Sequence, residues 1–160
     1  MSLWDRGAER RIHMAEILYQ GHGSFRLTTS EGSVIYIDPY AGEGYDRPAD
    51  LVLVSHEHHD HNAVELVKRK EDGKILRAGD VLKDGVYQEI RACGVKIKGT
   101  QAYNKNHPKD QCVGFVVEME GKKLYFACDT SRTEAMEQEL SGERLDYAFL
   151  PIDGVYNMGP

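Results

Sequence analysis

The feature that most constrains this chain is a cluster of four histidines and one aspartate within six consecutive residues. The cluster comes immediately after Leu51-Val52-Leu53-Val54, an apolar run with the length and composition of a buried β-strand. The end of a buried strand is a common place for enzymes to carry their chemistry. The members of the cluster are His56, His58, His59, Asp60 and His61. The pattern therefore predicts a loop at a strand end that holds metal ions.

The spacing of these donors suits two ions. A loop of this kind turns several imidazole nitrogens and carboxylate oxygens toward a common point, and borderline divalent ions accept both ligand types. One ion would take His56 and His58, and a second would take Asp60 and His61. Two simpler explanations stay open, a solvated loop that caps the following helix and a purification tag. A tag would lack the aspartate and would lie at a terminus.

The cluster and several other motifs resemble one known family. Residues 51–61 resemble the signature loop of the metallo-β-lactamase superfamily. Other stretches are similar to its lactonase-type branch, which includes ascorbate-6-phosphate lactonase-like proteins. These stretches are Gly21-His22-Gly23-Ser24-Phe25, Ile37-Asp38-Pro39-Tyr40, Ala102-Tyr103-Asn104 with His107-Pro108, Val113-Gly114-Phe115, residues 125–130, Leu150-Pro151-Ile152-Asp153-Gly154 and Asn157-Met158-Gly159-Pro160. The resemblance implies an α/β fold, the αββα sandwich of that superfamily.

The resemblance also implies the rest of the metal site. His107 matches the third histidine of the first ion, and Asp129 matches a carboxylate that bridges both ions. The residues alone leave alternatives open, since His107 could be an ordinary loop histidine and Asp129 could cap a helix. Two divalent ions, zinc or manganese, are expected. The expected metal ligands are His56, His58, Asp60, His61, His107 and Asp129.

The chemistry that the resemblance implies is hydrolysis of a small anionic ester, lactone or phosphate-containing substrate. Two divalent ions generate hydroxide from bound water near neutral pH and polarise the electrophile. Asp60 or Asp129 would accept or pass on a proton. Lys105 and Lys109, which flank His107, are candidates to attract the charge of the substrate. The alternatives are a phosphodiesterase or nuclease of the same fold, and a metal-binding module without catalytic activity.

The chain departs from the family pattern at two places. The branch usually has glycine before the bridging aspartate, whereas this chain has Cys128. A cysteine costs free energy there if the position needs a positive φ angle, or its thiolate could lie near the ions. The family also has a later histidine that completes the second ion site, and no histidine follows His107 here. We therefore expect a natural chain that continues beyond Pro160, and apolar surface that is uncovered in its absence.

Three residues near the predicted site are expected to have other roles. Asp38, which precedes Pro39 at a strand end, should orient the histidine loop through hydrogen bonds. His22 either lines the site or shapes a turn, and the pattern leaves both open. His59 occupies a variable position of the family loop, so it should be exposed or lie behind the ligands.

Length and composition limit the remaining possibilities. The 160 residues predict one domain, after a leader or expression-derived segment over residues 1–13. The resemblance implies that residues 14–160 are a metal-dependent hydrolase domain that lacks the usual C-terminal part. The net charge of −6 weighs against nucleic acid as a partner. The three cysteines lack paired spacing and should be reduced thiols. No membrane-helix window or signal-peptide pattern is found, so we expect a cytoplasmic protein without a membrane partner, in which a homo-oligomer could cover apolar surface.

Strand-like segments dominate the chain. We expect strands at residues 17–19, 25–29, 34–37, 51–54, 74–77, 94–101, 113–118, 123–128 and 147–150. A turn at Glu120-Gly121-Lys122-Lys123 should close a hairpin. Helices are expected over residues 62–70 and 131–140, the second opened by a capping-box pattern of Ser131 and Glu134. Strand groups with helices between them favour sheets that carry the site loops.

Overall fold

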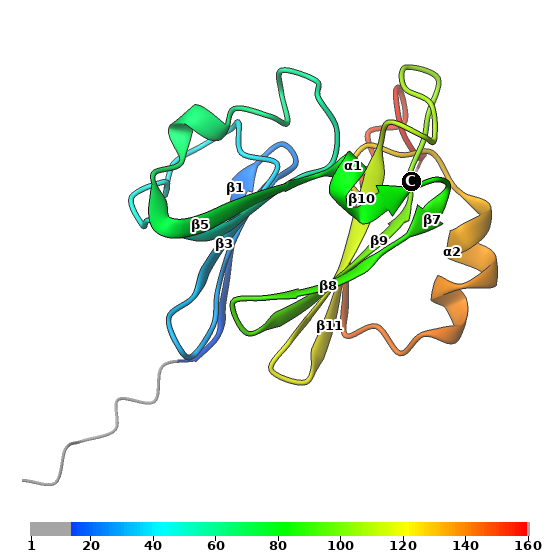
Figure 1. Ribbon diagram of the computed structural model, residues 1–160. Coiled ribbons are helices and arrows are strands. Elements are labelled where there is room, and N and C mark those ends of the chain that lie inside the picture. The colour runs from blue at the N-terminus through cyan, green and yellow to red at the C-terminus, as the bar shows by residue number, and fades with distance from the viewer. Residues whose placement is uncertain (1–13, 160) are drawn as a thin grey trace, which may run out of the picture.

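Two β-sheets face each other in the computed structural model, which describes residues 14–159 (Figure 1). The expected leader over residues 1–13, as well as Pro160, lies outside the described residues. Helices are few and short, and α2 (Glu134–Gln138) covers the outer face of the second sheet. The expected α/β sandwich is thereby confirmed. Every helix within residues 14–159 is too short or too polar to span a membrane.

The first sheet carries the histidine cluster. Its strand order is β1-β2-β3-β4-β5. The strands are β1 (Glu16–Gly21), β2 (Ser24–Thr28), β3 (Val34–Ile37), β4 (Ala49–Val54) and β5 (Arg69–Arg77). The β1, β2 and β3 strands pair antiparallel, whereas β3, β4 and β5 pair in parallel. Since parallel neighbours end at the same edge of a sheet, the segments after β3 and β4 emerge side by side.

The second sheet has the strand order β12-β11-β10-β9-β8. Its strands are β8 (Glu89–Ala92), β9 (Val95–Gln101), β10 (Val113–Met119), β11 (Lys122–Phe126) and β12 (Tyr147–Phe149). All pairs are antiparallel except β11 with β12. A small connecting unit lies between the sheets in the chain, made of α1 (Ala78–Val81), β6 (Leu82–Lys83) and β7 (Val86–Tyr87). The loops after β9 and β11 reach the same edge of the sandwich as the histidine cluster.

The core lies between the sheets and follows from the two-residue period of a strand. In β10, Phe115 and Val117 face this inner core, whereas Val116 faces the opposite side toward Leu140. Three aromatic rings join the layers, because Phe126 stacks on Phe149 at 4.7 Å and meets Phe25 edge-on at 5.1 Å between ring centroids.

Both expected helices differ from the structure. Residues 62–70 hold only the 3-10 turn η1 (Val64–Leu66), and β5 already begins at Arg69. So short a helix is marginal in water, and Val67 is instead buried against the cluster that contains Tyr36 and Val52. The later helix begins at Glu134 with Thr133 as its N-cap, not Ser131, and is followed by the 3-10 turn η2 (Leu140–Gly142). Each expected strand is found, but β6, β7, β8 and α1 were not expected.

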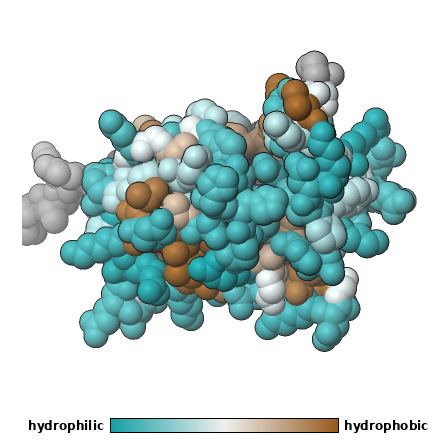
Figure 2. All heavy atoms as spheres, turned by 90° about the horizontal axis from the view of Figure 1, so that it is seen from above, coloured by the Kyte–Doolittle hydropathy of each residue, from teal (hydrophilic) through white to brown (hydrophobic). Residues whose placement is uncertain are grey.

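The last described residues expose several large apolar side chains. Figure 2 shows a mainly hydrophilic face with separate hydrophobic patches. The exposed residues of the C-terminal part are Tyr147, Leu150, Ile152, Val155 and Tyr156.

Candidate metal centre

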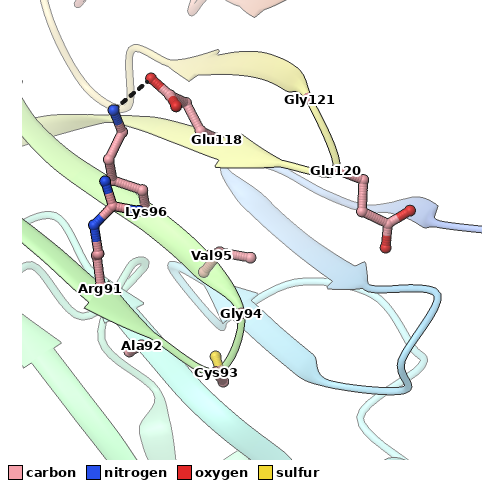
Figure 3. A pocket seen from close by; sticks show the side chains of 9 residues that line it. All are labelled: Arg91, Ala92, Cys93, Gly94, Val95, Lys96, Glu118, Glu120 and Gly121. Carbon is pink, nitrogen blue, oxygen red and sulfur yellow. Dashed lines mark ion pairs between the residues drawn. The ribbon is translucent and has the colours of Figure 1, made fainter.

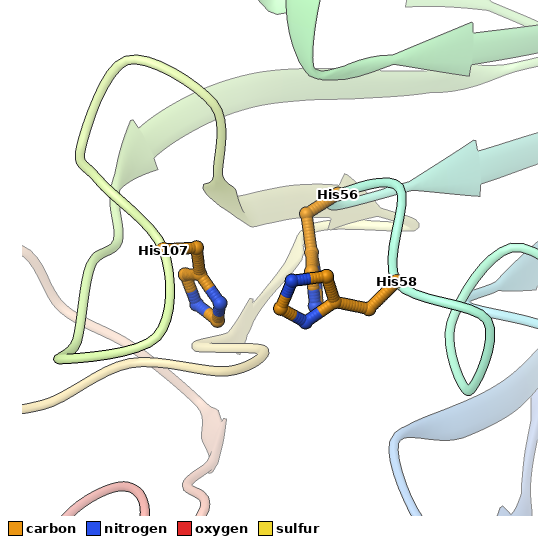
Figure 4. A group of neighbouring side chains, drawn as sticks. All are labelled: His56, His58 and His107. Atoms are coloured by element: carbon orange, nitrogen blue, oxygen red, sulfur yellow. The ribbon is translucent and has the colours of Figure 1, made fainter.

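Three histidines from two separate loops converge at one edge of the sandwich (Figure 4). His56 and His58 follow β4, and His107 lies in the loop between β9 and β10. Each offers one ring nitrogen, and the three nitrogens lie within 4.8 Å of one another. His56 and His107 are buried, whereas His58 is exposed. The structure thus brings together the side chains expected for the first ion.

Hydrogen bonds determine which nitrogen of His56 faces this group. Ser55 Oγ lies 2.9 Å from His56 Nδ1 and donates its own proton to Asp38 Oδ2. The Nδ1–H of His56 must therefore donate to Ser55, which leaves a lone pair on Nε2. Among the described residues, His56 Nε2 is one of the buried side-chain atoms without a hydrogen-bond partner. A buried bare nitrogen of this kind is costly unless it binds a cation.

His107 is oriented by a similar arrangement. Its Nε2 donates to the main-chain carbonyl of Asp129 at 2.9 Å, so Nδ1 carries the lone pair. This Nδ1 is also buried and without a partner in the part of the chain that the structure describes. The loop is held by Asn104, whose Oδ1 accepts the N–H groups of Asn106 and His107. The side chain of Asn104 donates in turn to Asn157 at 2.9 Å, so the C-terminal turn supports this loop.

A second donor group lies beside the first. It consists of His22, Asp60 and His61, whose ligand atoms are again within 4.8 Å of one another. Asp60 and His61 were expected together as ligands of a second ion, but His22 was not. The sequence offered one signal for His22, namely its place between two glycines in a tight turn.

Asp129 lies beside these donors without belonging to any of the three donor groups of the described residues, the third of which is Asp38, His56 and His61. Asp129 Oδ2 is 3.3 Å from His61 Nε2, and its charge also acts on His56 and His107. The structure therefore places this carboxylate beside both groups, although none of the three-residue donor groups of the described chain includes it.

Asp38 orients both groups from behind, as the sequence predicted. Its carboxylate is fully buried and accepts the main-chain N–H of Ser55 at 2.7 Å and the Ser55 hydroxyl at 2.5 Å. It also accepts the Nδ1–H of His61 at 2.8 Å. One carboxylate thus sets the ring orientation of His61 directly and that of His56 through Ser55, which is the supporting role that metal-binding histidines require.

The electrostatics of the site match divalent cations. Burial and the charge of His61 lower the pKa of His56 to about 4, so its imidazole is neutral. Burial alone would lower the pKa of His61, but the carboxylate of Asp129, 3.3 Å from Nε2, and the hydrogen bond to Asp38 raise it to about 10. The same partnership outweighs burial and lowers the pKa of Asp129. A cation that binds His61 must replace its proton, and neutral imidazoles with ionised carboxylates are the donors that zinc or manganese accepts.

A cavity of about 310 Å³ opens beside the first group and includes all three of its histidines. Its rim carries an ion pair in which Arg77 Nη1 contacts both carboxylate oxygens of Glu57, at 2.7 and 2.8 Å. Lys105 and Lys109, the expected attractants for substrate charge, do not line it. Lys105 donates instead to the carbonyl of Val155 at 3.2 Å.

A second cavity, of about 460 Å³, lies at the hairpin turns of the second sheet, at the strand ends that point away from the site (Figure 3). An ion pair of 2.8 Å joins Lys96 to Glu118 there. None of the donor groups found among residues 14–159 lies in this cavity, so it contributes nothing to the metal centre.

Cys128 has a positive φ angle, the conformation in which a cysteine was expected to cost free energy. Its φ angle is 56°, the left-handed region that favours glycine. Burial raises the pKa of its thiol well above the ordinary value, so the side chain is a neutral thiol. Cys128 belongs to none of the donor groups within the described residues. The backbone cost is therefore confirmed, whereas the alternative of a thiolate near the ions finds no support.

Two facing sheets with histidine and aspartate donors at one edge define the metallo-β-lactamase type of fold. Residues 16–160 match the family model described as a β-lactamase superfamily domain, and the chain belongs to this family. A UPF0173 metal-dependent hydrolase of Thermococcus onnurineus is 32% identical over 174 residues, which cover 92% of this chain and 76% of that protein.

Solved structures agree with this membership. A proposed metal-dependent hydrolase from Parabacteroides distasonis is 29% identical with a TM-score of 0.73, over 90% of this chain and 72% of that one. A proposed zinc-dependent hydrolase of the metallo-β-lactamase superfamily from Thermotoga maritima is 29% identical with a TM-score of 0.61, over 90% of this chain and 64% of that one. The fold and the family of the chain are therefore established.

Proposed function

We propose that this chain hydrolyses a small anionic ester, lactone or phosphate-containing substrate with two divalent ions, zinc or manganese. The observation that carries the proposal is the pair of buried, unpartnered nitrogens, His56 Nε2 and His107 Nδ1, in one group with His58. Nitrogens that cannot reach water are destabilising in an empty site and favourable around a cation. The names of the relatives, metal-dependent hydrolases, point to the same chemistry.

In this proposal the first ion binds His56, His58 and His107, and the second binds Asp60 and His61. Asp129 lies beside both groups and would bridge them. When bound, the ions lower the pKa of coordinated water and polarise the bond that is cleaved. Asp60 is partly exposed, and the charge of His61 outweighs burial and lowers its pKa. Asp60 and Asp129 are therefore ionised near neutral pH and can accept a proton that the attacking water loses.

The cavity offers one cationic side chain, Arg77, which is paired with Glu57 and lies in a lining that also includes Asp110. Of the described residues that line it, Arg77 is the only lysine or arginine. Its side chain is 39% exposed, so it can contact a carboxylate or phosphate group of a bound molecule if that group shares or displaces Glu57. The motif resemblance to the lactonase-type branch favours a lactone or sugar-phosphate substrate. The net charge of −6 disfavours a nucleic acid. The described cysteines are free thiols, which suits a reducing compartment such as the cytoplasm.

The test uses protein loaded with zinc or manganese. It measures the hydrolysis of two chromogenic probes, an aryl lactone and bis(p-nitrophenyl) phosphate. We expect turnover by the wild type, and a loss of at least about 100-fold in H58A, since removal of one ligand disrupts the first ion. H59A is the matched control, because His59 lies in the same loop and in none of the donor groups. Turnover of the phosphodiester alone would favour a phosphodiesterase or nuclease. One tightly bound ion without turnover of either probe would identify a non-catalytic metal-binding module and refute the proposal.

A further inference from the structure

The turn between β1 and β2 holds His22 in an unusual backbone conformation. Gly21 has φ 113° and His22 has φ 52°, so two consecutive residues lie in the left-handed region. Glycine adopts this region freely, whereas a histidine there costs free energy. The hydroxyl of Tyr19 donates to the His22 carbonyl at 3.1 Å and holds the turn in place. Residues held in such costly conformations are concentrated at active sites and ligand-binding positions.

The turn is pressed against the second donor group. A Cβ atom at Gly23 would lie 2.9 Å from His61 Cε1, closer than two carbon atoms can approach. Only glycine therefore allows this approach. The rings of His22 and His61 are 5.0 Å apart between centroids, and the ring of Tyr40 lies edge-on to His22 at 5.6 Å. The imidazole of His22 is thus positioned from the turn and from Tyr40 beside His61.

The ligand atoms have the separation of a metal site. His22 Nε2 lies 3.1 Å from Asp60 Oδ2. Two ligands that each lie about 2.1 Å from a tetrahedral ion are about 3.4 Å apart. The His22 side chain is 43% exposed and that of Asp60 is 29% exposed, so a cation can reach them from solvent. Small changes in side-chain position would place one ion between His22, Asp60 and His61.

We infer that His22 is a ligand of the second divalent ion, together with Asp60 and His61. This inference rests on the proposed two-ion site and assigns the turn residue that the sequence had left open between lining the site and shaping the turn. This role also explains the glycines on both sides of His22. Gly21 allows the turn, and Gly23 allows the turn to approach His61.

The experiment compares H22G with H59A in zinc titrations of chelator-treated protein against a chromophoric competitor. Glycine keeps the left-handed turn, so H22G removes the imidazole without adding strain. His59 is a close control, because it also packs edge-on against Tyr40, at 6.0 Å between ring centroids. We expect two bound ions in the wild type and in H59A. In H22G the first ion should bind as before, and the affinity for the second should fall at least about 10-fold, the lower bound for losing even a residue that only supports a ligand.

Two further measurements make the result specific. The visible absorption of the cobalt-loaded protein should lose the contribution of the second ion in H22G and keep it in H59A. Urea unfolding of the metal-free variants checks that both retain the fold. A second-ion affinity in H22G equal to that in H59A would overturn the inference, and so would a wild-type protein that takes up only one ion.

The outcome is separate from that of the proposed function. Two ions that depend on His22 without turnover of any probe would leave the ligand assignment standing and remove the hydrolase. Turnover together with full second-ion affinity in H22G would do the reverse.

Discussion

Replacement of Asp38 by asparagine is the sharpest test of how the metal centre is organised. The side chain of asparagine has the same shape, so it can still accept the main-chain N–H of Ser55. Its amide group, however, faces the Nδ1–H of His61, where the carboxylate accepts at 2.8 Å. Two donors now oppose each other. His61 relieves the conflict by losing the proton on Nδ1 and keeping one on Nε2, the nitrogen that should bind the second ion, as happens when a carboxylate beside a histidine becomes an amide.

The expected magnitude follows from these contacts. Loss of a carboxylate behind a metal-binding histidine costs about 10- to 100-fold in affinity, which is about 1.4 to 2.8 kcal/mol. The second ion should lose this much. The first ion should lose less, because Asp38 reaches His56 only through the Ser55 hydroxyl. The metal-free protein should also lose about 1.5 to 3 kcal/mol of unfolding free energy, the value of a hydrogen bond to a charged group.

Zinc titration and urea unfolding measure the two effects, and D50N is the control. Asp50, in β4, likewise accepts a main-chain N–H, from Val34 at 2.8 Å, and bonds a charged donor, Lys70 Nζ at 2.7 Å. It belongs to none of the donor groups within residues 14–159, so D50N should bind both ions like the wild type. If D38N bound the second ion as tightly as D50N does, the argument that Asp38 selects the tautomer of His61 would be refuted.

Three further predictions address the site and the core. G23A should lower the second-ion affinity at least about 10-fold in a zinc titration, because its Cβ would lie 2.9 Å from His61 Cε1; unchanged affinity would mean that the turn moves away freely. F126A should reduce the unfolding free energy by about 3 to 5 kcal/mol in urea, since it empties the space against Phe25 and Phe149; a loss below about 1 kcal/mol would contradict the described core. The metal-free protein should lose stability as the pH rises from about 6.5 toward about 10, because the pKa of His61 is raised in the folded state and its stabilising charge is lost as the pH passes through that value. Urea unfolding across this range checks it, and in H61Q this part of the pH dependence should be absent.

The strands and the histidine loop could be predicted from the sequence because their signals are local. The apolar run of β4 is buried on both faces, so it appears in the sequence as a continuous apolar segment. The donors that follow it come from one loop. His107 and Asp129 were predicted as ligands from the family resemblance and not from their spacing, because only the fold brings their loops to the same edge of the sandwich.

Two errors show where local signals fail. The expected helix over residues 62–70 is replaced by the 3-10 turn η1 and the start of β5, because pairing of β5 with β4 and burial of Val67 outweigh a weak helical preference. His22 was left undecided, because its partner Asp60 is 38 residues away in the sequence. No pattern in a turn of three residues reveals such a contact. Its two glycine neighbours were visible, but the close approach to His61 that explains Gly23 needs coordinates.

The hydrogen bond between Asn104 and Asn157 links the far end of the described chain to the loop of His107, a proposed ligand of the first ion. The turn that holds Asn157 is itself closed by Asp153, which accepts the N–H groups of Val155 and Tyr156. Thermodynamic linkage is reciprocal: if an ion bound at His107 orders this turn, then a molecule that orders the turn would tighten the binding of that ion. The exposed side chains of Val155 and Tyr156 therefore lie only a few hydrogen bonds away from the loop that carries His107.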